Sequence, residues 1–201
     1  MNAITLLKQD HKTVEALFKQ FETGKKTGAQ KKKIVEQIIR ELSVHAAIEE
    51  QVFYPAVRKA VKKAEDDVLE ALEEHHIVKW TLSELSKMTP SDERYDAKVT
   101  VLTEAVRHHV KEEEQELFPE VRKKMDAKML NALGAVMEKA KKVVPTRPHP
   151  RAPDSPPGNL LAGIGAALVD KARDALSGKG RKSNGAKAKP RGRATASSHA
   201  N

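Results

Sequence analysis

The sequence contains no cysteine in its 201 residues, and this absence excludes several classes of protein at once. Without thiols the chain has no disulfide framework, no thiolate zinc site, no iron–sulfur cluster and no covalently attached haem. It also has no cysteine nucleophile. Any metal binding or catalysis by this chain therefore depends on other side chains.

Aromatic residues are scarce, at 3% of the chain, whereas charged residues make up 32%. This balance is typical of helical bundles and argues against an all-β fold. Long apolar runs are absent too: the longest, residues 160–169, is about half of the roughly 20 residues that a membrane span needs. Residues 1–10 lack the basic and apolar regions of a secretory signal. We therefore expect a cytoplasmic protein.

Acidic residues are rare only in the last quarter of the chain. The formal net charge of +9 divides into +1 for residues 1–145 and +8 for residues 146–201. Six prolines between positions 145 and 158 favour an extended connection. We predict a helical domain over 1–144, a proline-rich linker over 145–158, a weak amphipathic helix over 159–177 and a basic tail, disordered for lack of apolar residues, over 178–201.

The predicted domain shows apolar positions at helical spacing almost throughout. Four long stretches are joined by short loops, and a shorter fifth is marked by Met129, Leu133, Val136 and Met137. We predict an all-α fold: an up-down-up-down four-helix bundle with the short fifth helix packed outside it. Pro55 and Pro119 are expected to follow the ends of the second and fourth helices.

The domain contains an internal repeat. Residues 45–59 align with residues 109–123, and the same offset places His11 on His75 and Asp10 on Glu74. A helical hairpin has therefore been duplicated.

The repeated polar residues lie on the apolar faces of the predicted helices. Each of four histidines is three or four residues from an apolar position, and two glutamates follow the second and fourth histidines by four residues, one turn along the same face. Burying these groups without partners would cost several kcal/mol at a rough estimate, and a bound cation removes that cost. The candidate metal ligands are His11, His45, Glu49, His75, His109 and Glu113.

Imidazole and carboxylate ligands without thiolate suit iron, zinc or manganese, and two glutamates between two histidine pairs suit a bridged pair of ions. His108 with Glu112 has the same four-residue spacing but does not match the repeat, in which Glu49 and Glu113 each precede a proline by six residues. The flanking acids either orient the imidazoles or are solvated charges; they are Asp10, Glu50, Glu74 and Glu114.

This set of residues resembles the hemerythrin-like, HHE cation-binding family. The resemblance covers nearly the whole predicted domain and rests on Asp10-His11, His45-x-x-x-Glu49, Glu74-His75-His76 and His109-x-x-x-Glu113. It implies a four-helix bundle with two non-haem iron ions, bridged by an oxo or hydroxo group and by the two carboxylates. Iron is thus favoured over zinc and manganese. Oxygen-carrying members have a further histidine where this chain has Lys79, a difference that argues against reversible oxygen transport.

Related bacterial proteins handle oxygen, nitric oxide, peroxide or iron, so we expect this chain to bind or sense such a small ligand. Two alternatives stay open. The same centre could turn over peroxide or nitric oxide as an enzyme, or the basic tail could bind nucleic acid or an anionic surface weakly and without sequence preference. The oligomeric state is not predicted by the sequence.

Overall fold

The computed structural model describes residues 1–153, so the predicted helix at 159–177 and the predicted tail at 178–201 lie outside the described residues. The helices are α1 Ala3–Glu22, α2 Gly28–Ile48, α3 Tyr54–Ala60, α4 Glu65–Leu85, α5 Tyr95–Glu112, α6 Phe118–Lys124 and α7 Ala127–Ala140. A π-helical turn joins α2 to α3 (η1, Glu49–Phe53), another joins α5 to α6 (η3, Glu113–Leu117), and a short 3-10 helix (η2, Lys62–Ala64) precedes α4. No β-strand occurs in this part of the chain.

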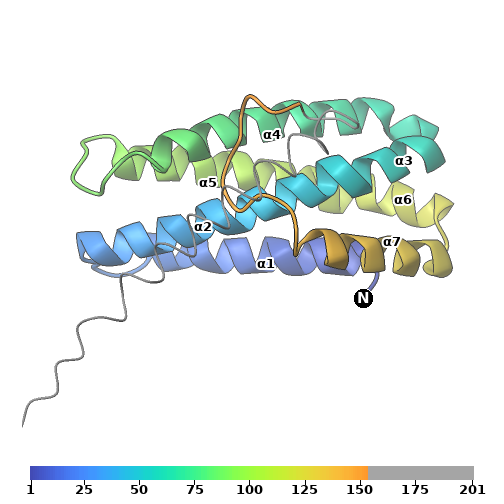
Figure 1. Ribbon diagram of the computed structural model, residues 1–201, viewed down its shortest axis with the longest axis horizontal. Helices are drawn as coiled ribbons and strands as arrows, with labels where there is room; N and C mark the ends of the chain where they lie inside the picture. Colours follow the sequence, from blue (N-terminus) through green and yellow to red (C-terminus); the bar gives the residue numbers. More distant parts are fainter. Residues whose placement is uncertain (154–201) are drawn as a thin grey trace, which may run out of the picture.

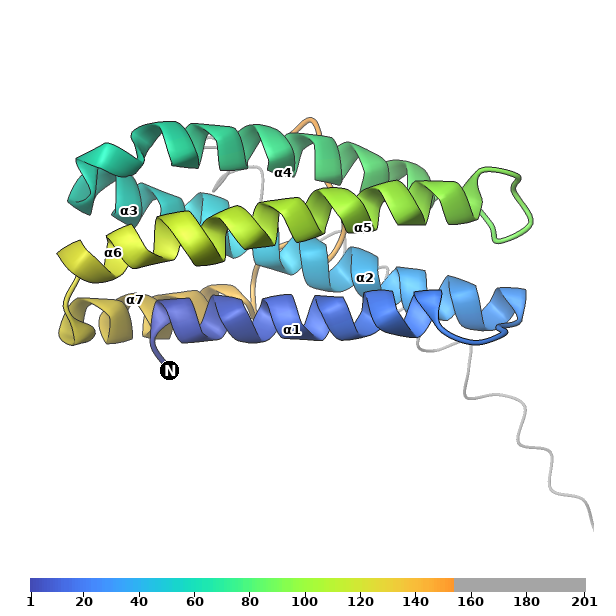
Figure 2. The same cartoon turned by 180° about the vertical axis from the view of Figure 1, so that it is seen from behind.

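The predicted up-down-up-down bundle is confirmed. Helix α3 continues the direction of α2, and α6 continues that of α5, so the chain forms four long antiparallel rods with α7 beside them (Figures 1 and 2). Helix α1 packs mainly on α2, and α4 packs mainly on α5. None of the helices in residues 1–153 is long and apolar enough to cross a membrane.

Polar side chains fix where the helices begin. Asn2 accepts a hydrogen bond from the N–H of Thr5 at the start of α1, and Asp126 does the same for Met129 at the start of α7. Thr27 and Gln30 form a reciprocal pair of side chain to backbone bonds at the start of α2. Gly24, with a φ of 74°, supplies the left-handed turn between α1 and α2.

The expectation that two helices end at the prolines is wrong. Pro55 lies in the first turn of α3, inside the rod formed by α2 and α3, and Pro119 lies in the first turn of α6, at the matching place in the rod formed by α5 and α6. Proline has no N–H to donate, so the regular α-helical bonding must change before it. The chain makes this change by a π turn in each rod. The N–H of Tyr54 donates to the carbonyl of Glu49 in the first turn, and the N–H of Phe118 donates to the carbonyl of Glu113 in the second.

The apolar core of residues 1–153 consists of two clusters. One, containing Val14, Phe18, Ile38, Leu82 and Tyr95, fills the end of the bundle near the α1–α2 and α4–α5 loops. The other contains Leu7, Phe53, Tyr54, Phe118 and Met137 and fills the opposite end, where α7 packs. Each predicted ligand helix passes from one cluster to the other, and the buried histidines lie where it does so. A polar layer is thus enclosed between two apolar ones.

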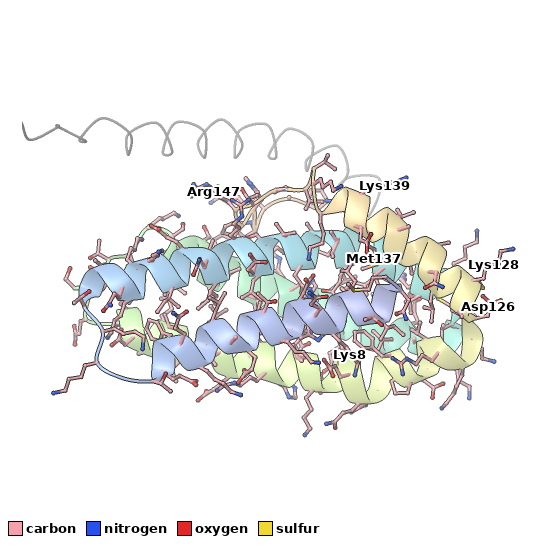
Figure 3. All side chains as sticks on the ribbon, turned by 90° about the horizontal axis from the view of Figure 1, so that it is seen from below. Lys8, Asp126, Lys128, Met137, Lys139 and Arg147 are labelled. Atoms are coloured by element: carbon pink, nitrogen blue, oxygen red, sulfur yellow. The ribbon has the colours of Figure 1, made fainter. Side chains whose placement is uncertain are left out.

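Helix α7 confirms the predicted fifth helix, although its buried side differs from the expected one. Met129 and Val136 are 45% and 52% exposed, whereas Leu130, Gly134 and Met137 are buried. Figure 3 shows α7 beside α1, with Lys128 directed outward. A Cβ on Gly134 would lie 2.2 Å from the carbonyl oxygen of Met1, so the absence of a side chain there permits the close contact between these helices.

The part of the predicted linker that the structure describes, residues 145–153, lies on the bundle. Pro145 is buried, and residues 146–150 are half-buried. The guanidinium of Arg151 lies 6.0 Å from the centre of the Trp80 ring on α4, and Figure 1 shows this segment crossing the bundle. This contact covers part of the α2–α4 side.

Candidate metal centre

The structure brings all six predicted ligand residues together in the polar layer. The four histidines are between 3% and 6% exposed, Glu49 is 0% exposed and Glu113 is 2% exposed. His11 comes from α1 and His75 from α4, whereas His45 and His109 lie in the last turns of α2 and α5, directly before Glu49 and Glu113 begin the π turns.

Their side-chain atoms form two groups that share a carboxylate. The first group contains His11, His45, Glu49 and Glu113, and the second contains Glu49, His75 and His109. Oε2 of Glu49 lies 3.0 Å from Nε2 of His45 and 3.4 Å from Nε2 of His75. Oε2 of Glu113 lies 3.3 Å from Nε2 of His11 and 3.6 Å from Nε2 of His109. Each carboxylate therefore faces one histidine of each pair.

Several of these inward atoms have no hydrogen-bond partner. In the described residues they are Nε2 of His11, Nε2 of His45, both carboxylate oxygens of Glu49 and Oε2 of Glu113. Nε2 of His75 lies only 3.2 Å from Nε2 of His109, so two further ring nitrogens face each other in this layer. Buried acceptors that face one another and lack donors fit a bound cation, which supplies the missing positive charge.

The pKa shifts describe the same imbalance of charge. Burial, together with the negative charge of Glu113, raises the pKa of Glu49 well above its usual value. Burial also opposes ionisation of Glu113, but the neighbouring His109, His11 and His45 lower its pKa overall. Burial lowers the pKa of His45 to about 4. The cluster alone thus favours neutral His45 and one neutral carboxyl group.

A second set of carboxylates orients the imidazole rings. Nδ1 of His11 lies 2.9 Å from Glu114, that of His75 lies 3.1 Å from Glu50, and that of His109 lies 2.7 Å from Glu74. Nδ1 of His45 lies 3.6 Å from Asp10. A carboxylate beside Nδ1 favours the proton on that nitrogen and leaves the lone pair on Nε2 directed inward. These four acids are therefore partners of the imidazoles, not solvated charges.

Three of the four acids beside the rings also contact a lysine. Lys8 lies 2.8 Å from Glu114, Lys141 lies 2.6 Å from Asp10, and Lys79 lies 2.9 Å from Glu50. Lys79, which stands where oxygen-carrying hemerythrins have a further histidine, is 7% exposed. Its ammonium group therefore neutralises a carboxylate behind His75.

Tyr54 is a site residue that the sequence indicated only as a neighbour. Its buried hydroxyl donates a hydrogen bond of 2.9 Å to Oε1 of Glu113 and lies 3.5 Å from Nε2 of His75. Burial and the charge of Glu113 raise the pKa of Tyr54, so the phenol keeps its proton. The π turns are the other missed feature; the only signal for them is a proline repeated inside each long helical stretch.

The alternative pair His108 and Glu112 lies outside this layer. The His108 side chain is 62% exposed, and its Nε2 lies 3.1 Å from Glu112 and 3.9 Å from Glu74. His76 likewise turns away from His75 and contacts Nε1 of Trp80 at 3.0 Å.

A small cavity adjoins the four histidines. Its volume is about 20 Å³, and apart from the imidazoles its walls are apolar side chains, including Val14, Leu42, Val78 and Val106. This volume is sufficient for one water molecule or a molecule of similar size.

The bundle and its buried cluster of histidines and carboxylates define a cation-binding helical protein. The hemerythrin HHE cation binding domain matches residues 2–121, so the chain belongs to this family. An uncharacterized hemerythrin-like protein of Schizosaccharomyces pombe is 33% identical over 141 residues, which are 70% of each chain.

Two further proteins are similar to this chain. A hemerythrin HHE cation binding domain-containing protein from Mycobacterium kansasii has a crystal structure that superposes with a TM-score of 0.59, at 26% identity over 71% of this chain and 88% of that one. A protein of Nostoc named DNA nickase is 29% identical over 150 residues, and the match spans 73% of this chain but only 41% of the nickase.

Proposed function

We propose that this chain binds two iron ions through His11, His45, Glu49, His75, His109 and Glu113 and uses them to bind or sense a small ligand. The observation that carries the proposal is that each of the two carboxylates lies between the two histidine pairs. Glu49 and Glu113 each contact one histidine of the first pair, His11 and His45, and one of the second pair, His75 and His109. Carboxylates shared in this way are suited to two ions. Candidate ligands are dioxygen, nitric oxide and peroxide.

The donor set is compatible with iron, and membership of the hemerythrin family favours iron over zinc and manganese. Two imidazoles with shared carboxylates resemble the combination of two histidines and a carboxylate that leaves open positions on non-haem iron. Iron bound there would supply open coordination positions and a change of oxidation state. The fifth histidine of oxygen-carrying hemerythrins would fill one such coordination position. Here that residue is Lys79, whose ammonium group is paired with Glu50.

The protein's own groups define what reaches the centre. The cavity of about 20 Å³ beside the histidines admits only small ligands, and its other walls are apolar side chains. The Tyr54 hydroxyl holds Glu113 in place, and the three carboxylates within 3.1 Å of an Nδ1 atom keep the Nε2 lone pairs of those histidines directed inward. These contacts hold the ligand side chains in place, so a small molecule can bind or leave without a rearrangement of the bundle.

The cavity gives a direct test with azide, a small anion that ligates ferric iron. We expect oxidised, iron-loaded protein to develop a new absorption band on titration with azide. Val106→Leu should weaken azide binding at least roughly tenfold without changing the iron content, because the added methylene occupies the cavity. The measurement is the optical titration together with metal analysis.

Val99→Leu is the matched control, since Val99 is equally buried on α5 but does not line the cavity. Equal azide affinity in all three proteins would show that ligands do not use this cavity.

The enzyme alternative predicts steady consumption of peroxide by the iron-loaded protein and none by the metal-free protein, whereas a binding or sensing protein reacts once.

A further inference from the structure

A second cavity reaches the candidate metal centre from the α4–α5 side. Its volume is about 50 Å³, room for a cation with a few water molecules. His109 and Glu113 of the centre are among its lining residues, so it connects the centre with the surface.

The lining of this cavity is acidic. Among residues 1–153, six carboxylate side chains and no lysine or arginine line it; the six are Asp67, Glu70, Glu74, Glu112, Glu113 and Glu116. Several carboxylates elsewhere on the bundle pair with basic residues; Glu15 and Glu22, for example, both contact Arg107. The α4–α5 cavity therefore concentrates negative charge, and its walls focus the resulting field.

Groups able to bind a cation lie at both ends of this acidic cavity. Glu113 is 2% exposed, and its Oε2 has no hydrogen-bond partner. At the outer rim, His108, Glu112 and Glu74 place one possible ligand atom each within 4.8 Å of one another. Glu74 lies between this outer group and the metal centre, because one of its oxygens contacts His109 at 2.7 Å while the other lies 3.9 Å from His108.

The internal repeat provides a built-in comparison. At the offset that places His75 on His11, the acidic-side residues Asp67, Glu70, His108 and Glu112 correspond to Ala3, Leu6, Val44 and Ile48. Those four counterparts are buried in the apolar cluster that also contains Leu130 and Met137 of α7. One half of the duplicated bundle is thus sealed by apolar packing, whereas Asp67 and Glu70 in the other half are exposed and acidic.

We propose that the acidic α4–α5 cavity is the route by which a divalent cation reaches the buried centre, with His108, Glu112 and Glu74 as its first binding position. This inference rests on the proposed metal centre. A cation is drawn to the rim by charge, exchanges water for His108 and Glu112, and moves inward along Glu74 toward His109 and Glu113. The route controls the rate of metal uptake and leaves the final metal content unchanged.

The test measures the rate of Fe²⁺ uptake by metal-free protein without oxygen and at low ionic strength. Samples are quenched with a chelator at successive times, and protein-bound iron is determined. The combined variant Glu70→Gln, Glu112→Gln and Glu116→Gln should take up iron about tenfold more slowly than the wild type and reach the same final content. Added salt should slow the wild type and reduce this difference.

The control is the combined variant Glu36→Gln, Glu93→Gln and Glu104→Gln, which makes the same change in net charge at exposed residues outside the cavity. Its uptake rate should stay within about twofold of the wild type. Equal rates in the wild type and the cavity variant, or equal slowing in both variants, would overturn the proposed route. If even the wild type takes up no iron, the metal centre fails and the route fails with it.

Discussion

Replacing His75 with alanine should lower the iron content and the thermal stability of the protein together. A ligand that binds only the folded state adds RT ln(1 + [L]/Kd) to stability, or about 4 kcal/mol when its concentration is 1,000 times Kd. In a domain of this size that corresponds to a fall in melting temperature on the order of 10 °C. Metal analysis and thermal unfolding of the same iron-loaded samples measure both effects.

The matched control is His76→Ala, which changes the next residue on α4. His76 contacts Trp80 at the surface, so its removal should leave iron content and melting temperature nearly unchanged. Without metal, the melting temperature of the His75 variant should also lie much closer to that of the wild type. A His75 variant that keeps its full iron content would remove this residue from the ligand set.

Replacing Glu49 with glutamine should have opposite effects on the metal-free and the iron-loaded protein. The raised pKa of Glu49 means that its burial beside Glu113 destabilises the metal-free fold at neutral pH. Glutamine does not ionise in either the folded or the unfolded state and so removes this penalty, and we expect the metal-free protein to gain about 1–3 kcal/mol. The iron-loaded protein should instead lose iron, because a shared anionic ligand has been removed.

The pH dependence gives the sign of this effect independently. A carboxyl group with a raised folded pKa binds more protons in the folded state than in the unfolded state, so its destabilising contribution grows as pH rises above 4.5, the unfolded value. The advantage of Glu49→Gln in metal-free protein should therefore be present at pH 7 and disappear toward pH 4. Chemical unfolding at several pH values measures it, with the exposed Glu36→Gln on the same rod as control.

A Glu49→Gln protein that is less stable than the wild type even without metal would contradict this explanation. That result would mean that Glu49 stabilises the fold through hydrogen bonds, and that its carboxylate is not held in a site built for a cation.

Much of the fold and of the candidate centre could be predicted because both depend on periodicity. Apolar residues at helical spacing define the four rods, and the internal repeat aligns two hairpins whose histidines occupy equivalent positions. A histidine such as His109 lies on the same face as Val106, and that face is necessarily the interior. The structure accordingly brings His109 inside and leaves His108 exposed.

The features that were missed depend on tertiary packing, which periodicity does not contain. Proline at position 55 or 119 is compatible with either a helix end or a π turn, and the apolar cluster around Phe53 and Phe118 favours continued packing. Helix α7 buries Leu130 and Gly134 rather than Met129 and Val136 because it approaches α1 at the small Gly134. Lys79 could be located on the inward face, but its pairing with Glu50 on the neighbouring rod depends on the arrangement of both.

We propose that two iron ions share Glu49 and Glu113, and the metal content of iron-reconstituted protein tests this proposal most directly. After removal of excess metal, we expect two irons per chain and, after oxidation, the charge-transfer absorption of a coupled pair. One iron per chain in a fully loaded sample, with the spectrum of an isolated ion, would contradict it.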